Sequence, residues 1–322
     1  MAPRIPLLFG TATFGADGKN GVRIAEQREC QGVLDVFFGA GHRELDTSRT
    51  YGEGTTEEML GKLDLRDAVV DTKVYPNTPG DHSPANLRGL FLQSLKALGR
   101  ERVRTFYLHA PDRSVPFEET VAEVNRLHSE GRFEIFGLSN FASWEVAEII
   151  MTCRANNWVQ PRVYQVMYNA ITREMEDELA PCCRKFGLRI VTYNPLAGGL
   201  FAGKVSLSGA APDGGRFDPS SPMGQLYRSR YVQEGYLRAL ELLKPVADAH
   251  NLRLTEIALR WLQHHSDLSP EDGVILGASS AAQLAENCAD CERGPLPEAV
   301  VQALDEAQRT VKVYGHAPRY WR

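Results

Sequence analysis

Short runs of apolar and β-branched residues alternate along this chain with longer segments whose apolar residues recur at helical spacing. In the segment 117–132, for example, Phe117, Val121, Val124 and Leu127 fall on one helix face. The short runs predict strands, and they cover residues 7–15, 42–48, 68–74, 103–110, 133–140, 162–169, 188–195 and 272–279.

Eight predicted strands alternating with helices favour an α/β fold in which a parallel sheet closes on itself, a (β/α)8 TIM barrel. The alternative is a doubly wound open sheet. That fold usually carries G-x-G-x-x-G between its first strand and first helix. The corresponding stretch here, FGTATFGADGKNG, spaces its glycines differently. We therefore predict the barrel, as a single domain over residues 1–322.

Two segments interrupt the alternation. Residues 206–225, SLSGAAPDGGRFDPSSPMGQ, lie between the seventh and eighth strands and are rich in Gly, Pro and Ser. A stretch this long without regular structure predicts a functional loop rather than a linker. After the eighth strand, a helical pattern at 297–309 is followed by the tail VYGHAPRYWR.

Composition excludes several classes of partner. The 322 residues carry a net charge of −5 with both signs mixed along the chain, which argues against binding to nucleic acid. No apolar run approaches the roughly 18 residues that a membrane-spanning helix needs. The six cysteines do not form a disulfide framework, and Cys288 and Cys291 lack a second pair at metal-ligand spacing. These features predict a cytoplasmic protein with reduced cysteines, no metal site and no membrane partner.

Polar side chains stand at the carboxyl ends of the predicted strands, after apolar runs. These ends converge on one rim of a parallel barrel, where active sites are built. They bear Asp46, Lys73, His109, Asn140, Asn194 and Ser279, and Tyr51 follows the second strand closely enough to reach the same rim.

Four of these residues form a coherent chemical set. A free phenol has a pKa of about 10, and a nearby ammonium lowers that value. A partly buried lysine needs a counter-charge to stay protonated. We therefore expect Asp46 to hold Lys73 cationic, Lys73 to lower the pKa of Tyr51, and Tyr51 to protonate an oxygen. His109 can hydrogen-bond the same oxygen. Such a set would convert a carbonyl to an alcohol if a hydride reached the carbon.

Each residue alone has a plainer interpretation. His109 could be a structural histidine, Asp46 could close a turn, and Lys73 could be solvated. A further alternative is a barrel aldolase, in which Lys73 would form an imine that borohydride traps. The joint occurrence of all four residues, in order and on one rim, favours the reductase.

Sequence motifs in the same order resemble those of the aldo-keto reductase family. They are LDTSRTYGEGTTEEMLG, DTKV, FYLHAPD, GLSNF and VILGASSAAQLAEN, and they span nearly the whole chain. The segments VYQVMYNAITREMEDEL, NPLAGGLFAGK, GRF and RYWR are similar to the subgroup that reduces aflatoxin aldehyde and succinic semialdehyde.

The resemblance implies that Tyr51 is the general acid, completed by Asp46, Lys73 and His109, and that NADP(H) lies across the rim. Ser139, Asn140 and Gln165 would hold the carboxamide of the cofactor. Implied contacts to the pyrophosphate and adenosine are Asn194, Leu196, Gly198, Lys204, Arg216, Gly277, Ser279, Gln283 and Asn287. The helix after the eighth strand would offer N–H groups to phosphate.

One departure from the family pattern concerns the 2′-phosphate. Many family members carry a Lys and an Arg after the eighth strand, where this chain has Ala278 and Gln283. A preference for NADPH would then depend on Ser279 with Lys204 or Arg216.

The family's substrate pocket is made by loops and the tail. The residues implied here are Phe14, Trp144, Arg228, Arg230, Tyr320, Trp321 and Arg322. Arginines suit a carboxylate, so we predict that Arg322, with Arg228 or Arg230, binds the distal carboxylate of an aldehyde such as succinic semialdehyde. Resemblance also suggests a homodimer, and it leaves open a non-catalytic, cofactor-binding subunit like relatives that attach to membrane channels.

Overall fold

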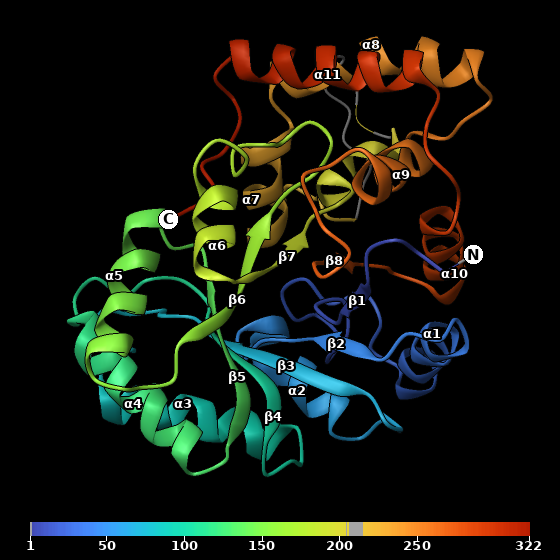
Figure 1. Ribbon diagram of the computed structural model, residues 1–322. Coiled ribbons are helices and arrows are strands. Elements are labelled where there is room, and N and C mark those ends of the chain that lie inside the picture. Colours follow the sequence, from blue (N-terminus) through green and yellow to red (C-terminus); the bar gives the residue numbers. More distant parts are fainter. Residues whose placement is uncertain (1, 204, 206–214) are drawn as a thin grey trace.

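The computed structural model describes residues 2–203, 205 and 215–322 and forms the predicted barrel (Figure 1). Its parallel strands are hydrogen-bonded in the order β1 to β8, and β8 closes onto β1. The strands are β1 Leu7–Gly10, β2 Glu44–Asp46, β3 Val69–Val74, β4 Val103–Leu108, β5 Phe133–Ser139, β6 Pro161–Met167, β7 Arg189–Tyr193 and β8 Gly273–Leu276. Each lies within or beside its predicted run, so the fold class predicted from the alternation is confirmed.

Helices surround the strands. They are α1 Gln27–Gly39, α2 Thr55–Leu60, α3 Pro84–Ala97, α4 Phe117–Ser129, α5 Ser143–Ala155, α6 Leu179–Phe186, α7 Pro222–Tyr231, α8 Glu234–Ala249, α9 Leu254–His264, α10 Ala281–Cys291 and α11 Glu298–Val313, with 3-10 turns η1 Tyr51–Gly54 and η2 Ala197–Ala202. The C-terminal helix predicted at 297–309 is α11, which lies beside α8 (Figure 1).

The insertion between β7 and β8 is less irregular than predicted. Residues 206–214 lie outside the described part, but Pro222 begins α7 inside the segment that was expected to lack regular structure. The Ser221 hydroxyl accepts a hydrogen bond from the Gly224 amide at 3.0 Å, and proline fits the first helical position. Ser and Pro are common in loops, but here this Ser-Pro pair caps and begins a helix.

The middle of the barrel is filled by side chains. Leu8, Tyr107, Val163, Val191 and Ile275 form a buried apolar layer inside the ring of strands. The Tyr107 ring lies against Gly137, where a Cβ atom would come within 2.3 Å of the ring. The register between β5 and β6 shifts between Phe136 and Gly137, at this same point. Gly137 therefore makes room for an aromatic ring that crosses the barrel.

We expect Gly137→Ala to lower the free energy of unfolding by about 1–3 kcal/mol, because the added methyl overpacks against Tyr107. Gly32→Ala in α1 is the matched control, since nothing lies within 4 Å of the Cβ it adds. That change should stabilise the chain by about 0.5–1 kcal/mol. Urea unfolding of both variants measures the difference, and equal effects would contradict the packing argument.

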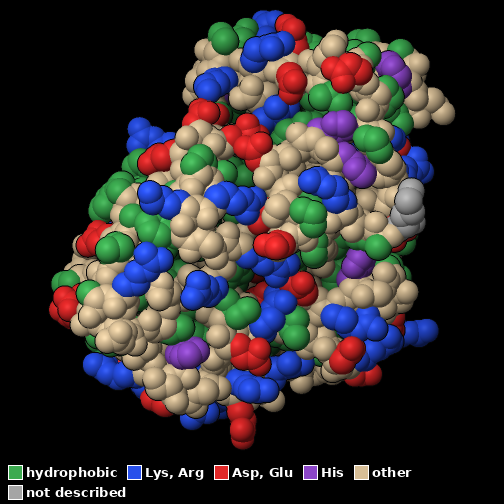
Figure 2. Space-filling model, viewed as in Figure 1, with side chains coloured by type: hydrophobic (Ala, Val, Ile, Leu, Met, Phe, Trp, Pro, Cys, Tyr) green, Lys and Arg blue, Asp and Glu red, His purple; other side chains and the backbone are tan. Residues whose placement is uncertain are grey.

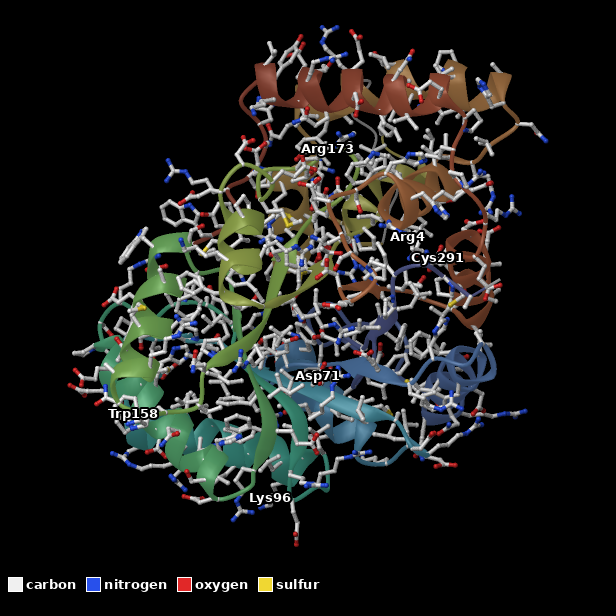
Figure 3. The ribbon with its side chains drawn as sticks, viewed as in Figure 1. Arg4, Asp71, Lys96, Trp158, Arg173 and Cys291 are labelled. Carbon is white, nitrogen blue, oxygen red and sulfur yellow. The ribbon has the colours of Figure 1, made fainter. Side chains whose placement is uncertain are left out.

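An ion network occupies the amino-terminal end of the barrel. Arg104 contacts both Asp71 and Glu44, and Arg189 donates to Glu44 at 2.9 Å. Asp71, labelled in Figure 3, is a buried residue of β3. These paired charges and the neighbouring apolar layer fill the amino-terminal end of the barrel. The candidate active site therefore lies at the carboxyl end.

The surface and the cysteines agree with the composition. Lys and Arg side chains are mixed with Asp and Glu over the face shown in Figure 2. All six cysteines are free, and burial raises the pKa of Cys288 to about 11, so the thiol stays protonated.

None of the helices within the described residues has the length and apolar character that crossing a bilayer demands. In the same part of the chain, no cluster of three or more His, Cys, Asp or Glu is arranged to hold a metal ion.

Candidate active site

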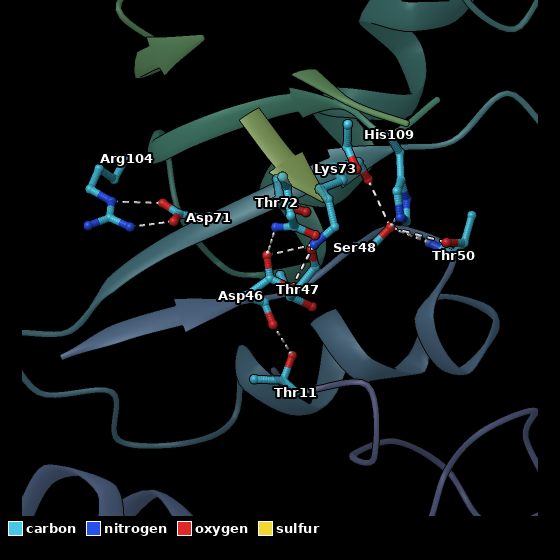
Figure 4. Close-up of polar contacts among 12 residues, drawn as sticks. Thr11, Asp46, Thr47, Ser48, Thr50, Asp71, Thr72, Lys73, Arg104 and His109 are labelled. Carbon is cyan, nitrogen blue, oxygen red and sulfur yellow. Dashed lines mark hydrogen bonds and ion pairs between the residues drawn. The ribbon is translucent and has the colours of Figure 1, made fainter. Parts of the chain in front are cut away.

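A buried ion pair lies at the carboxyl end of two adjacent strands. Asp46 ends β2, and Lys73 is the penultimate residue of β3. Lys73 Nζ lies 2.7 Å from each carboxylate oxygen of Asp46 and 2.8 Å from the Thr47 carbonyl oxygen (Figure 4). All three ammonium protons therefore have acceptors. Burial raises the pKa of Asp46 above its ordinary value, while Lys73 and an amide from Gln165 oppose that shift.

Tyr51 is placed above this pair by a tight turn. It begins η1, and the next residue, Gly52, has φ = 53°. A Cβ at Gly52 would lie 2.9 Å from the hydroxyls of Thr55 and Thr56, so the turn requires glycine. The turn brings the Tyr51 ring centroid within 5.1 Å of Lys73 Nζ. The segment Tyr-Gly thus positions a phenol over a buried cation.

The pKa of Tyr51 is displaced in the direction opposite to the one predicted. Burial raises the pKa well above its ordinary value, and the nearby Asp46 carboxylate adds to the shift. These two effects outweigh the lowering that was expected from the nearby Lys73 cation, so the net shift of the pKa runs upward. The prediction on this point is wrong. The Tyr51 phenol keeps its proton at neutral pH, which is the state that a proton donor needs.

His109 follows β4 and faces Tyr51. Their rings are nearly perpendicular, with centroids 6.1 Å apart, and Tyr75 packs against the same imidazole at 5.4 Å. Nδ1 of His109 lies 3.1 Å from the Ser48 hydroxyl. Burial lowers the pKa of His109 well below its ordinary value, and the Lys73 charge lowers it further. The imidazole is therefore neutral at physiological pH.

Polar residues of β5 and β6 extend the site. Gln165 donates from Nε2 to Asp46 at 2.7 Å. Asn140 has φ = 63° and donates to the His109 carbonyl oxygen at 2.8 Å. Tyr193 donates its hydroxyl to Asn140 at 3.0 Å. These bonds fix two amide side chains beside the ion pair.

A cavity of about 610 Å³ opens above these residues. The predicted residues that line it are Asp46, Tyr51, His109, Asn140, Gln165, Asn194, Leu196, Gly198, Arg216, Arg230, Gly277, Ser279, Gln283, Asn287 and Arg322. Lys73 and Ser139 are fully buried beside the cavity rather than in its lining. Lys204 lies outside the described residues.

Five predicted substrate residues lie away from the cavity lining. Phe14 is buried against Phe9, with ring centroids 5.5 Å apart. Trp144 is 60% exposed on α5. Arg228 turns its guanidinium toward the Phe217 carbonyl oxygen at 3.4 Å. Packing therefore holds Phe14 away from the cavity and a backbone contact holds Arg228, while Trp144 faces solvent.

The other two belong to the tail. The Tyr320 hydroxyl lies 2.7 Å from that of Ser143 and donates to Glu178 at 2.9 Å. The Trp321 ring packs against the guanidinium groups of Arg113 and Arg319, 5.9 and 5.0 Å from its centroid. These contacts anchor the tail beside the start of α5, and Arg322 is the tail residue that reaches the cavity.

The insertion covers one side of the cavity through Tyr227 of α7. Its hydroxyl donates to Asn194 at 3.0 Å and accepts from Arg216 at 2.9 Å. A Cβ at Gly198 would lie 2.2 Å from the Tyr227 ring. Glycine at that position therefore lets α7 dock on η2. A Cβ at Gly277 would lie 3.7 Å from Arg216, so the arginine reaches the end of β8.

The far end of the cavity lies at the start of α10. Ser280 caps this helix by accepting from the Gln283 amide at 3.2 Å. Ser279 donates its amide and hydroxyl to the Gln283 side chain at 2.9 and 3.1 Å. The buried Nδ2 of Asn287 finds no hydrogen-bond partner in the part of the chain described here. This unsatisfied donor belongs to a residue that lines the cavity.

Several lining residues were missed by the sequence analysis. Tyr75, Tyr193 and Tyr227 line the cavity, as do Thr50 and Asn77. Tyr75 and Tyr193 stand at the ends of β3 and β7, so the same strand-end rule could have found them. An aromatic residue after an apolar run is also what core packing uses, so the sequence alone does not separate the two roles.

A parallel barrel with these polar strand ends is the architecture of an oxidoreductase family. The family model described as aldo/keto reductase matches residues 6–309, so the chain belongs to the aldo/keto reductase family. The resemblance seen in its motifs is thereby confirmed, and the chain is an oxidoreductase.

Named relatives agree with this assignment. Aldo-keto reductase family 7 member A3 of Homo sapiens is 44% identical over 305 residues, which are 90% of this chain and 91% of the relative. Aflatoxin B1 aldehyde reductase member 2 of Mus musculus is 45% identical over 302 residues, 89% of this chain and 81% of the relative. An aldo-keto reductase of Pseudocercospora fijiensis is 43% identical over 290 residues, which are 87% of this chain and 98% of the relative.

Proposed function

We propose that this chain reduces aldehydes with NADPH and that Tyr51 is the proton donor. The observation that carries the proposal is the buried Asp46–Lys73 pair directly beneath Tyr51, with neutral His109 alongside and a cavity above. A carbonyl oxygen placed between Tyr51 and His109 would meet one proton donor and one hydrogen-bonding ring. The two groups together hold and protonate the same oxygen.

Each member of the set has a distinct task. Tyr51 holds its proton until negative charge develops on the carbonyl oxygen, and then donates it. The Lys73 ammonium, 5.1 Å from the ring, stabilises the phenolate that remains. Asp46 keeps the ammonium charged and fixed, because it accepts two of its protons. Burial excludes water from the pair and strengthens these interactions.

The cavity lining supports a nicotinamide dinucleotide as the cofactor. When bound, the cofactor supplies hydride to the carbonyl carbon. Gln165 and Asn140 would hold its carboxamide, and Ser139 supports Asn140 through a 3.0 Å hydrogen bond. Arg216 would meet its phosphates beside Asn194, Leu196 and Gly198. The Nδ2 group of Asn287, which has no partner within the described residues, would donate to the adenosine end.

The preference for NADPH rests on few cations. Ala278 and Gln283 occupy positions where the family resemblance leads us to expect a lysine and an arginine. Arg216, which reaches the β8 end, and the Ser279 hydroxyl are the described groups proposed to meet a 2′-phosphate. Lys204, outside the described residues, is proposed to help them. The predicted homodimer and the cytoplasmic location stay predictions.

We propose that the substrates include aldehydes with a distal carboxylate. The Arg322 amide donates to the Asn140 carbonyl oxygen at 3.0 Å, and its guanidinium donates to the Tyr75 hydroxyl at 3.2 Å. Arg230 lines the same cavity, near the ring of Tyr227. Two arginines and aromatic walls suit succinic semialdehyde or a flat aromatic aldehyde. Relatives named for aflatoxin B1 aldehyde reduction support the second class.

Arg322→Ala should lower kcat/KM for succinic semialdehyde by about tenfold or more, because a charge-assisted hydrogen bond is worth about 1.5–3 kcal/mol. The value for the uncharged pentanal should change by about twofold or less. Arg319→Ala is the control, since this exposed arginine packs over Trp321 and does not line the cavity. Equal losses on both aldehydes would refute carboxylate recognition.

A panel of aldehydes assayed in parallel with NADPH and NADH tests the function itself. We expect steady NADPH oxidation matched by alcohol formation, and a higher kcat/KM with NADPH than with NADH. Cofactor binding without turnover on any aldehyde would instead favour the non-catalytic, cofactor-binding subunit.

The geometry opposes the aldolase alternative for Lys73. An imine requires a free amine, whereas this ammonium donates to three oxygen atoms and is fully buried. Borohydride added with an aldehyde substrate should leave no mass increase on Lys73.

A further inference from the structure

A serine hydroxyl lies directly behind the histidine of the site. Ser48 follows Asp46 by two residues, is fully buried, and places Oγ 3.1 Å from Nδ1 of His109 (Figure 4). The other ring nitrogen, Nε2, has no hydrogen-bond partner among the residues that the structure describes. His109 lines the cavity, so Nε2 is the nitrogen available to a ligand there.

The charge state of His109 makes the position of its proton important. Burial and the nearby Lys73 hold the pKa of His109 well below its ordinary value, so the ring is neutral. A neutral imidazole carries one N–H and one bare nitrogen. With the proton on Nε2, His109 presents a donor to a carbonyl oxygen. With the proton on Nδ1, it presents a lone pair, which repels that oxygen.

The neighbours of Ser48 determine where its own proton goes. Its hydroxyl can donate to the Lys73 carbonyl oxygen at 3.1 Å, and it lies 3.1 Å from the Thr50 hydroxyl. The Lys73 carbonyl already accepts from the Arg49 amide at 3.1 Å. Thr50 can donate to Ser48 through its hydroxyl and through its amide, the latter at 3.4 Å. The Lys73 carbonyl therefore keeps a donor when Ser48 gives its single proton to His109 and accepts from Thr50.

We propose that Ser48 is a positioning residue that donates to Nδ1 of His109 and thereby holds the tautomer with the proton on Nε2. This inference rests on the proposed function, because it assigns the donor that meets the carbonyl oxygen. Ser48 transfers no proton during the reaction. It sets the direction of the hydrogen bond that His109 makes, while Tyr51 supplies the proton.

The direct test is the tautomer of His109 in the full chain with NADPH bound. Nitrogen-15 NMR of histidine-labelled protein distinguishes protonated from bare ring nitrogens, and His109→Gln identifies the signals. We expect Nε2 to be protonated in the unchanged protein and this preference to be lost in Ser48→Ala. Thr192→Val is the matched control, because it removes a buried hydroxyl that bonds the Gly273 carbonyl oxygen at 3.3 Å. It should leave the His109 signals unchanged.

Kinetics provide a second readout. Ser48→Ala should lower kcat for aldehyde reduction about tenfold with the Kd for NADPH unchanged, since one hydrogen bond to the oxygen is weakened. In a His109→Gln background the same substitution should cost nothing further. A proton found on Nδ1 in the unchanged protein, or an equal loss in both backgrounds, would overturn the proposal. The NMR measurement does not require turnover. The role of Ser48 can therefore be tested even if the proposed function fails.

Discussion

Tyr51→Phe should lower kcat for aldehyde reduction by at least about a hundredfold, because the variant lacks the proton that the carbonyl oxygen receives. The ring remains in place over Lys73, so packing and the shape of the cavity change little. We therefore expect the Kd for NADPH, measured by fluorescence titration, to stay near that of the unchanged protein. Loss of turnover without loss of cofactor binding separates a chemical role from a structural one.

Tyr164→Phe provides the matched control for this experiment. Tyr164 is a fully buried barrel tyrosine whose hydroxyl donates to the Phe141 carbonyl oxygen, away from the cavity lining. Loss of the Tyr164 hydroxyl should leave turnover unchanged at a temperature where the variant is folded. Retained activity in Tyr51→Phe would remove Tyr51 from its role as proton donor.

Lys73→Met should remove activity and also destabilise the fold. The substitution leaves the buried Asp46 carboxylate without its counter-charge, and breaking a buried ion pair from one side typically costs about 3–5 kcal/mol. Urea unfolding measures that loss, and NADPH oxidation with an aldehyde measures activity. We expect both to fall together.

The double variant Asp46→Asn, Lys73→Met separates the two effects. It removes both charges, and an amide at position 46 can still accept the hydrogen bond that Gln165 gives to Asp46. Most of the lost stability should return, whereas turnover should not, because no ammonium remains to stabilise the phenolate. Recovery of activity in the double variant would contradict the role given to Lys73.

The barrel and its rim could be predicted because their signals are local in sequence. A short apolar run predicts a strand, and in a parallel barrel every strand ends at the same rim. The grouping of Asp46, Lys73 and His109 on this rim could therefore be predicted without any knowledge of the loops. Tyr51 could be added because only a short turn separates it from β2.

The substrate side could not be predicted in the same way. Tyr320 and Trp321 lie in a tail with no strand to fix their direction, and their contacts with Ser143 and Arg113 depend on a helix far away in the sequence. Arg228 and Arg230 are two residues apart on α7, yet only Arg230 lines the cavity. Which helix face meets the cavity depends on how α7 docks.

The pKa of Tyr51 and the tautomer of His109 depend on three-dimensional detail of another kind. Proximity of a lysine to a tyrosine suggests a lowered pKa, but burial and the Asp46 carboxylate raise the pKa of Tyr51 instead. In the sequence alone, Ser48 is indistinguishable from an ordinary small residue of a turn. Its importance follows from hydrogen-bond partners on β3 and immediately after β4, which the linear order does not reveal.

Replacing Tyr51 with fluorinated tyrosines of increasing acidity tests the central claim most directly. If the hydroxyl of residue 51 donates its proton as the carbonyl is reduced, the single-turnover rate of NADPH oxidation should rise along the series. The raised pKa of Tyr51 keeps the phenol protonated near neutral pH, so this trend should persist until a substituted phenol ionises. A rate that stays the same across the series, with NADPH binding intact, would contradict proton donation by Tyr51.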